Sequence, residues 1–237
     1  MSNVKEISKS FMNSVDPFNY YKNNFLGMNY LMHKKTKLKI SNAQKRILTS
    51  LHKSDSVTVS MPRQKGLSSA LSLYVAWILL YDYERRIIVI TDSDNTGSHF
   101  ISKVRDILQK SSDFNNTKLV VDNRNRIDYD FCSVKSRTAS IDALRGEGPD
   151  IVIVENAAYI KNLGELMAPM EMVFSARNCQ VIMTSTFERN YPISDFFKEW
   201  IIEKRKKSKF LMRNLLLEKA SKYNVIDHES CEVLNFL

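Results

Sequence analysis

The sequence predicts an α/β fold with a mostly parallel central sheet and helices on both of its faces. Residues 56–61 alternate between polar and apolar side chains as a strand does, and residues 86–91 and 150–154 are nearly continuous apolar runs. Such runs are typical of strands that are covered on both faces. The first two strands are each followed by a segment with helical character, at residues 68–80 and 95–109. Strands that alternate with helices along the chain favour a parallel sheet.

The remaining elements follow in chain order. Residues 1–55 are predicted to be mainly helical, joined by a polar connection. Further along, a short strand is expected at residues 119–121, and an edge or hairpin strand at residues 127–134. A helix over residues 163–177 then leads to another short apolar strand at residues 180–183.

Residues 61–69 read MPRQKGLSS and match most of the phosphate-loop pattern G-x-x-x-x-G-K-[ST]. In that pattern, backbone N–H groups hold phosphate, the lysine neutralises the β and γ phosphates, and the hydroxyl reaches magnesium. Gly66 and Ser68 fill the last glycine and hydroxyl positions, but Leu67 stands in the lysine position. Lys65 is close in sequence, although its side chain leaves the loop from a different point. Taken alone, the segment also fits an unrelated strand, turn and helix.

An acidic residue, Glu155, ends the apolar run at 150–154, and a carboxylate in that place can hold magnesium. In many ATPases built this way the next residue is a glutamate that polarises the attacking water. Here it is Asn156, whose amide orients water but cannot accept its proton. The strand at 180–183 is followed by three hydroxyl residues that are placed to sense a γ phosphate, because ligands bind at the carboxyl edge of such sheets: Thr184, Ser185 and Thr186.

In these motifs and their order, the chain resembles the ATPase domain of phage large terminase subunits, the motors that pump DNA into empty capsids. The resemblance covers roughly residues 16–200, is nearest to the T4-like branch, and implies the P-loop NTPase fold of the RecA/ASCE type. Other segments that carry it are residues 16–21, 38–40 and 142–146. Its implied nucleotide-binding residues are Gln44, Arg63, Gln64, Lys65, Gly66, Leu67, Ser68 and Ser69.

The resemblance also implies roles for single residues. Gln44 matches the glutamine that recognises adenine, and Arg63 matches an arginine that acts on the γ phosphate. Ser68 and Glu155 stand where the family holds magnesium, so the implied cofactors are ATP and Mg²⁺. The implied catalytic residues are Arg63, Glu155 and Asn156, and the implied coupling residues are Thr184, Ser185 and Thr186.

The chain departs from the family at positions that carry chemistry. Leu67 replaces the catalytic lysine, Glu155 replaces an aspartate, and Asn156 replaces the catalytic glutamate. Loss of one preorganised transition-state contact typically costs about 3 kcal/mol. We therefore expect impaired or absent ATP hydrolysis, unless Lys65 or Glu147 compensates.

Three regions are expected: a helical region with the adenine motif at 1–55, a terminase-like ATPase core at 56–202, and a basic helical extension at 203–237. The family motor carries a metal nuclease domain after its ATPase. No cluster of acidic metal ligands follows Trp200, so a nuclease domain is expected to be absent. The cysteines are three and widely spaced, which argues against a disulfide framework or a zinc site and fits a reducing cytoplasm.

The formal net charge of +9 is unevenly distributed. A basic run near the C-terminus could bind a DNA backbone, form a solubilising helix surface or meet an acidic protein: Lys204, Arg205, Lys206 and Lys207. The partners that the resemblance implies are double-stranded DNA, the portal, the small terminase or a catalytically competent large terminase. No segment is long and apolar enough for a membrane partner, and the expected location is the cytoplasm of the infected host cell.

Two functions stay open on these observations. One is a terminase-like protein of viral DNA packaging that lacks efficient ATP hydrolysis and binds DNA, the portal or a genuine terminase. The other is an active ATP-driven packaging motor in which Lys65 takes the place of the missing loop lysine.

Overall fold

The computed structural model describes residues 40–53, 56–81, 84–110, 118–177, 179–187, 223–226 and 233–234. The helices are α4 (Asn42–Lys53), α5 (Leu67–Tyr81), α6 (Asp94–Lys110), the short 3-10 helix η2 (Ala157–Tyr159) and α7 (Leu163–Arg177). The strands are β1 (Ser56–Pro62), β2 (Arg86–Thr91), β3 (Leu119–Asn123), β4 (Arg126–Tyr129), β5 (Ser133–Thr138), β6 (Ile151–Val154), β7 (Gln180–Phe187), β8 (Tyr223–Ile226) and β9 (Val233–Leu234).

The strands form one sheet in the order β3-β4-β5-β2-β6-β7-β1-β8-β9. Every pair from β5 to β8 is parallel, and an antiparallel hairpin lies at each end. The predicted mostly parallel sheet is confirmed. Strand β7 lies between β1 and β6, so the end of the phosphate-loop strand and the end of the acidic strand are separated by a single strand.

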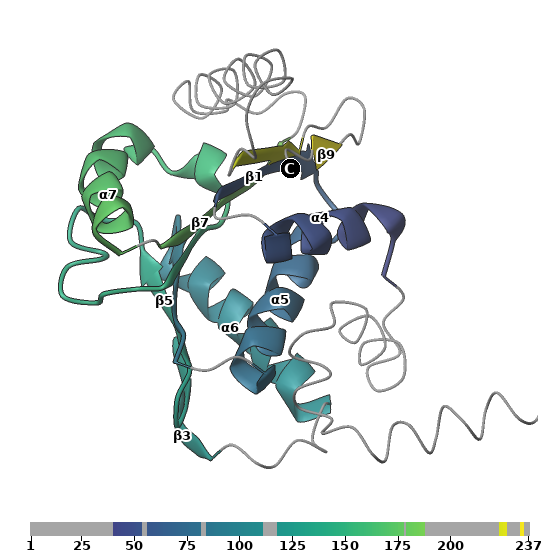
Figure 1. The fold of residues 1–237 in the computed structure, drawn as a ribbon, viewed down its shortest axis with the longest axis vertical. Coiled ribbons are helices and arrows are strands. Elements are labelled where there is room, and N and C mark those ends of the chain that lie inside the picture. Colours follow the sequence, from purple (N-terminus) through teal and green to yellow (C-terminus); the bar gives the residue numbers. More distant parts are fainter. Residues whose placement is uncertain are drawn as a thin grey trace, which may run out of the picture.

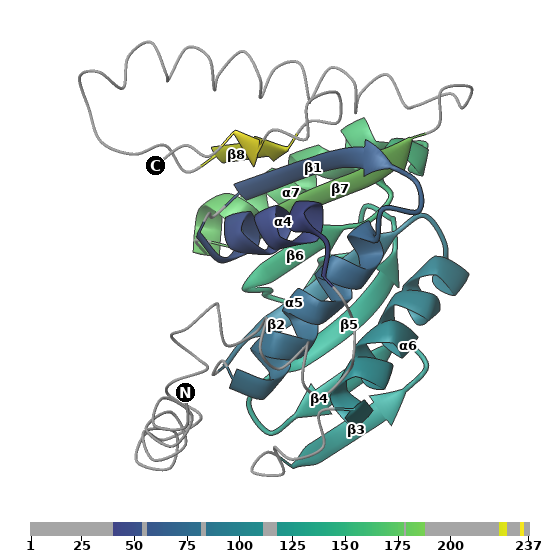
Figure 2. The ribbon, with the colours of Figure 1, turned by 90° about the vertical axis from the view of Figure 1, so that its right-hand side faces the viewer.

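Helices cover both faces of the sheet, as the sequence predicts. Figure 1 shows α7 on one side and α4, α5 and α6 on the other, and Figure 2 looks onto the side with three helices. Helix α6 is amphipathic and buries Phe100, Ile101 and Val104 against the sheet, which is the spacing of one helical face. Helix α5 is buried at every position from Ala70 to Leu79, because it contacts both α4 and α6.

Several predicted elements differ from the structure. The expected single strand at 127–134 is two strands, β4 and β5, separated by a turn in which the Tyr129 N–H donates to the Cys132 carbonyl at 2.8 Å. Strand β5 is a parallel neighbour of β2, yet its sequence SVKSRT is largely polar, so an apolar-run criterion does not find it. Strands β8 and β9 add to the sheet from within residues 203–237, where only helix was expected.

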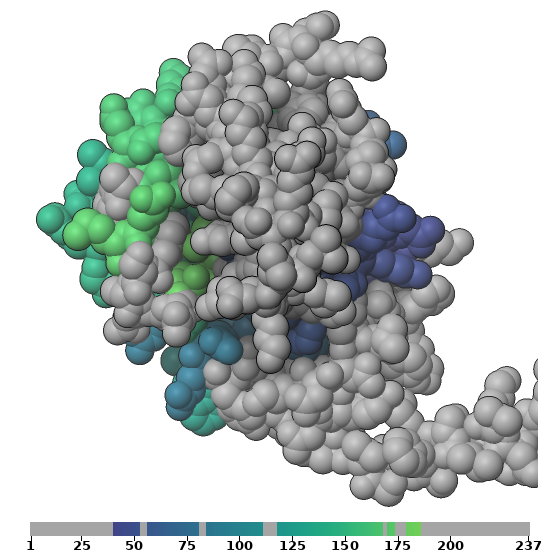
Figure 3. All heavy atoms as spheres, turned by 45° about the horizontal axis from the view of Figure 1, so that its top comes forward, coloured from purple at the N-terminus to yellow at the C-terminus, as the bar shows by residue number. Residues whose placement is uncertain are grey.

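In the space-filling view of Figure 3, α4 and α7 reach the surface at opposite sides. The α4 surface includes the exposed residues Lys45 and Arg46. Among the helices of the described ranges, none combines the length and the apolar character that crossing a membrane requires.

Candidate nucleotide-binding site

The phosphate loop connects β1 to α5 and contains two residues in the left-handed region, Gln64 at φ 63° and Gly66 at φ 79°. Glycine adopts this conformation without steric cost, whereas it is uncommon for glutamine. The Gly66 carbonyl accepts the Ala70 N–H at 3.0 Å and so begins α5. The loop therefore lies at the N-terminus of a long helix, which is the arrangement expected of an anion site.

The two halves of the predicted site meet. Ser68, in the first turn of α5, lies near enough to the Glu155 carboxyl, which directly follows β6, to act on its pKa as a hydrogen-bonding neighbour. Glu155 is only 4% exposed, and its Oε2 has no hydrogen-bond partner among the described residues. A buried carboxylate oxygen without a partner, beside a hydroxyl, supplies the hard oxygen ligands that Mg²⁺ prefers.

The electrostatic environment of Glu155 disfavours its charge. Burial is the largest influence and raises the pKa of this carboxyl above its usual value, and the neighbouring charge of Asp92 adds to the rise. The hydrogen bond from Ser68 and the charge of Lys103 act in the opposite direction but do not outweigh burial. Burial therefore makes the charged form of this carboxyl more costly than it is in water.

The position of the missing lysine is occupied by a core side chain. Leu67 is 4% exposed and belongs to the apolar cluster between the sheet and α4, α5 and α6. Lys65, in contrast, is exposed on the loop. The structure thus places the apolar replacement inside the fold and the adjacent cation at its surface.

Asn156 has a left-handed backbone, with φ 57° and ψ 37°, and its side chain makes no capping bond to η2. Asparagine tolerates this conformation better than most residues, because its short amide can bond locally. A glutamate in the same place has no such advantage. The local backbone therefore suits the asparagine that stands at this position.

The β7 hydroxyls hold the turn that follows β6. Thr184 donates to the Val154 carbonyl at 3.3 Å, and the Ser185 hydroxyl accepts the Ala158 N–H at 3.1 Å. Both side chains are completely buried. These bonds connect β7 to the segment that carries Glu155 and Asn156. Direct contact with a γ phosphate stays a prediction, and the side chain of Thr186 lies outside the described part of the chain.

Arg63 and Gln44 both contact neighbouring parts of the fold. The Arg63 guanidinium lies 5.5 Å from the ring centroid of Tyr159, within the range of a cation–π contact. The Gln44 side-chain amide donates to the Gly66 carbonyl at 3.0 Å. Two of the predicted nucleotide-binding residues are thereby connected to the acidic turn and to the phosphate loop.

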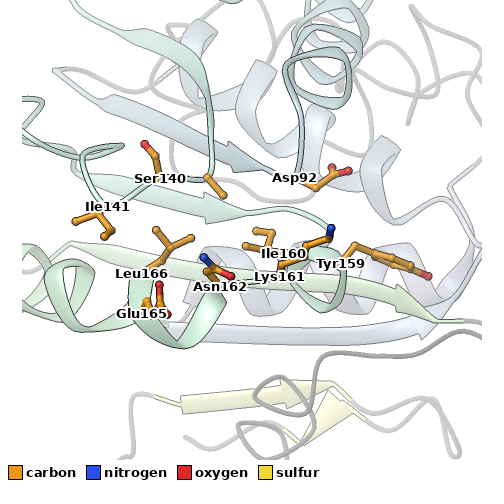
Figure 4. A pocket seen from close by; sticks show the side chains of 10 residues that line it. Asp92, Ser140, Ile141, Tyr159, Ile160, Lys161, Asn162, Glu165 and Leu166 are labelled. Carbon is orange, nitrogen blue, oxygen red and sulfur yellow. The ribbon is translucent and has the colours of Figure 1, made fainter.

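A pocket of about 450 Å³ lies beside this site, shown in Figure 4. One wall is Asp92, which follows β2. Another is formed by Tyr159, the last residue of η2, and by the segment that leads from it into α7, including Asn162. Helix α6 follows β2 on one face of the sheet, and α7 follows the neighbouring strand β6 on the other face. The pocket therefore lies where the chain leaves two adjacent strands in opposite directions. Crevices of this kind are where open α/β sheets bind ligands.

Glu147, considered as a substitute base, has other partners. Its Oε1 accepts from Lys135 Nζ and from Arg137 Nη2, each at 2.6 Å. Burial alone would raise the pKa of Glu147, but these two hydrogen bonds and their charges lower it below its usual value. A carboxylate held in this way is a weaker base, so compensation by Glu147 is not supported by the geometry.

Sequence reasoning missed two neighbours of the site, Asp92 and Tyr159. Asp92 directly follows an apolar strand, which is the same signal that singled out Glu155. Tyr159 has no local signal, because its contact with Arg63 joins segments far apart in the chain.

The basic run at residues 204–207 lies outside the described residues. Within the described ranges, no group of three or more His, Cys, Asp or Glu side chains is placed to hold a metal ion.

The strand order and the glycine turn before α5 give the chain an α/β fold of the P-loop NTPase type. No family model matches the sequence. Among solved structures, the large terminase ATPase domain of Thermus phage P74-26 has 18% identity and a TM-score of 0.56, over 72% of each chain. The chain therefore has the fold of phage large terminase ATPase domains.

Two further structures agree on the fold. The large terminase of bacteriophage HK97 is similar at 12% identity and a TM-score of 0.58, over 72% of this chain and 37% of that one. The large terminase of the thermophilic bacteriophage D6E is similar at 12% identity and a TM-score of 0.52, over 72% and 44%. The chain thus matches less than half the length of these two terminases.

Proposed function

We propose that this chain is a terminase-like protein of viral DNA packaging that binds ATP with Mg²⁺ and hydrolyses it slowly or not at all. One observation carries the proposal: the phosphate-loop serine and the acidic strand end meet, while the lysine position is packed into the core. Ser68 and Glu155 retain what magnesium binding needs. Leu67 and Asn156 lack what phosphoryl transfer needs, namely a cation on the γ phosphate and a proton acceptor for water.

Different residues would bind the phosphates and the metal ion. The N-terminus of α5 and the loop N–H groups would hold phosphates, and Ser68 with Glu155 would hold the metal ion. Mg²⁺, when bound, supplies charge neutralisation for the β and γ phosphates. Asn156 would orient a water molecule without activating it. The proposed protein therefore releases most of its bound nucleotide unhydrolysed.

The test is a calorimetric titration of ATP with Mg²⁺ alongside a phosphate-release assay on the same preparation. We expect binding with turnover at least about 100-fold below that of a competent site, the usual effect of losing one preorganised donor. Lys65→Ala should weaken binding, with Lys110→Ala on the far end of α6 as the matched control. Absence of ATP binding at millimolar concentration would overturn the proposal.

The exposed position of Lys65 favours a second candidate, an active motor domain that uses this lysine. The same assays separate the two. A motor predicts phosphate release that DNA or portal stimulates and that Lys65→Ala abolishes, whereas the terminase-like binder predicts little release with or without DNA. Nuclease activity is not part of either proposal.

Double-stranded DNA is the proposed macromolecular partner, through the run at 204–207 together with Lys45 and Arg46 on α4. Contacts to phosphates release counterions. The logarithm of the association constant should therefore fall linearly with the logarithm of the salt concentration. We expect replacement of Lys204, Arg205, Lys206 and Lys207 by Ala to reduce the salt slope by about 3–4, at roughly 0.9 per phosphate contact. Fluorescence anisotropy with a duplex of random sequence measures it. An unchanged slope would assign the run to solubility or to a protein partner.

A further inference from the structure

Both polar atoms of the Gln44 side chain form hydrogen bonds within the protein. Its Oε1 accepts the Ser41 N–H at 2.9 Å, while its own backbone N–H donates to the Ser41 hydroxyl at 3.2 Å. These reciprocal bonds form a capping box at the start of α4. Its Nε2 donates to the Gly66 carbonyl at 3.0 Å. Both ends of the amide that would read a base are therefore already bonded.

The partner of this amide is the pivotal residue of the phosphate loop. Gly66 is left-handed at φ 79°, and its carbonyl accepts both the Ala70 N–H and the Gln44 amide. A Cβ at Gly66 would lie 2.3 Å from Gln44 Nε2, so the glutamine also fills the space that only glycine leaves open. Helix α4 packs on α5, which keeps the two segments adjacent (Figure 2).

We propose that Gln44 is a positioning residue that fixes the phosphate loop through Gly66 instead of reading the nucleotide base. The bond to the carbonyl that begins α5 holds the loop N–H groups in the orientation that phosphates need. It follows that the site discriminates weakly between ATP and GTP. This inference deepens the proposed function. Its test by ligand binding rests on that function, whereas its test by hydrogen exchange does not.

Two substitutions separate the roles of the amide. Gln44→Glu keeps an oxygen for the Ser41 N–H and hence the cap, but it places a carboxylate with no proton to donate against the Gly66 carbonyl. Ser41→Ala removes the hydroxyl of the capping box and leaves the bond to Gly66 in place. If Gln44 only starts α4, Ser41→Ala has the larger effect. If it positions the loop, Gln44→Glu does.

The first readout is amide hydrogen exchange of residues 62–70, measured on the full chain without ligand. We expect exchange to be about 3–10-fold faster in Gln44→Glu, the usual effect of one hydrogen bond, and close to wild type in Ser41→Ala. Exchange in β2 serves as the internal control for global unfolding. Equal exchange in the two variants would overturn the positioning role.

The second readout compares ATP, GTP and inorganic tripolyphosphate, each with Mg²⁺. A positioning residue predicts that Gln44→Glu weakens all three by the same factor, about 3–10-fold. Weakening of ATP alone, with tripolyphosphate unchanged, would restore the role in adenine recognition and overturn the inference. If none of the three binds the wild-type chain, the proposed function fails, and hydrogen exchange still decides whether Gln44 holds the loop.

A double-mutant cycle gives an independent check. Gly66→Ala forces Gln44 out of its place and strains the backbone, whereas in a Gln44→Ala background only the backbone strain remains. We expect Gly66→Ala to shift the unfolding midpoint less in that background. Additive shifts would show that the contact is absent in solution.

Discussion

Glu155→Gln is expected to raise the melting temperature of the ligand-free protein while it removes stabilisation by ATP with Mg²⁺. The carboxyl is 4% exposed and one of its oxygens has no partner among the described residues, so its charge is poorly compensated. A buried polar group without a partner costs about 1–3 kcal/mol. For a domain of this size, each kcal/mol corresponds to about 2–4 °C in melting temperature. Differential scanning fluorimetry with and without the ligand measures both effects.

The change in melting temperature caused by Glu155→Gln should depend on pH. Burial raises the pKa of Glu155 above its usual 4.5, so the folded protein favours the protonated form. The resulting stability is fully present below pH 4.5 and is lost as the pH rises through the raised pKa. The advantage of Glu155→Gln over wild type should therefore be small near pH 4.5 and increase towards pH 8.

Glu171→Gln, an exposed site on α7, is the matched control and should leave the melting temperature unchanged across this range. If Glu155→Gln instead lowers the melting temperature at pH 8, a cation compensates the carboxylate in solution. That outcome would remove the electrostatic account of the site. A stabilising substitution at a residue needed for ligand binding is the usual sign of a functional site.

The fold and the central contact of the site followed from local patterns. A strand ending in Glu155 and a strand leading to Gly66 and Ser68 both point their carboxyl ends to one edge of a parallel sheet, so their meeting was predictable. The conformation of single residues was not. Neither the inward direction of Leu67 nor the left-handed backbone of Asn156 has a signal in the sequence, because both depend on neighbours placed by the whole sheet.

Contacts between residues far apart in the chain could not be predicted from the sequence either. The spacing of Ser41 and Gln44 is that of a capping box, but the bond from Gln44 to Gly66 joins residues 22 positions apart. In β5, a polar sequence takes a parallel place beside β2. Its buried positions are Val134 and Ser136 while Lys135 and Arg137 bind Glu147, so an ion pair partly replaces the apolar packing that sequence patterns detect.

Introducing the lysine and glutamate of the terminase motifs that the chain resembles, by Leu67→Lys and Asn156→Glu, is expected to destabilise the ligand-free protein strongly. Replacing a buried leucine typically costs about 2–5 kcal/mol, and here the new group is a cation in an apolar cluster. A left-handed residue other than glycine or asparagine costs about 1–2 kcal/mol. Together these approach the whole stability of many domains, about 5–15 kcal/mol. Chemical denaturation measures the loss.

Controls separate packing from charge at these two positions. Leu67→Met conserves volume and should cost less than about 1.5 kcal/mol, and Asn156→Gly should be neutral because glycine accepts φ 57°. ATP with Mg²⁺ should stabilise the double variant more than wild type, because phosphates draw the lysine out of the core. Asn156→Asp is the better repair, since aspartate tolerates the left-handed backbone and supplies a carboxylate. A Leu67→Lys variant as stable as wild type without nucleotide would mean that position 67 already faces the phosphate site, and the proposed slow hydrolysis would then need another cause.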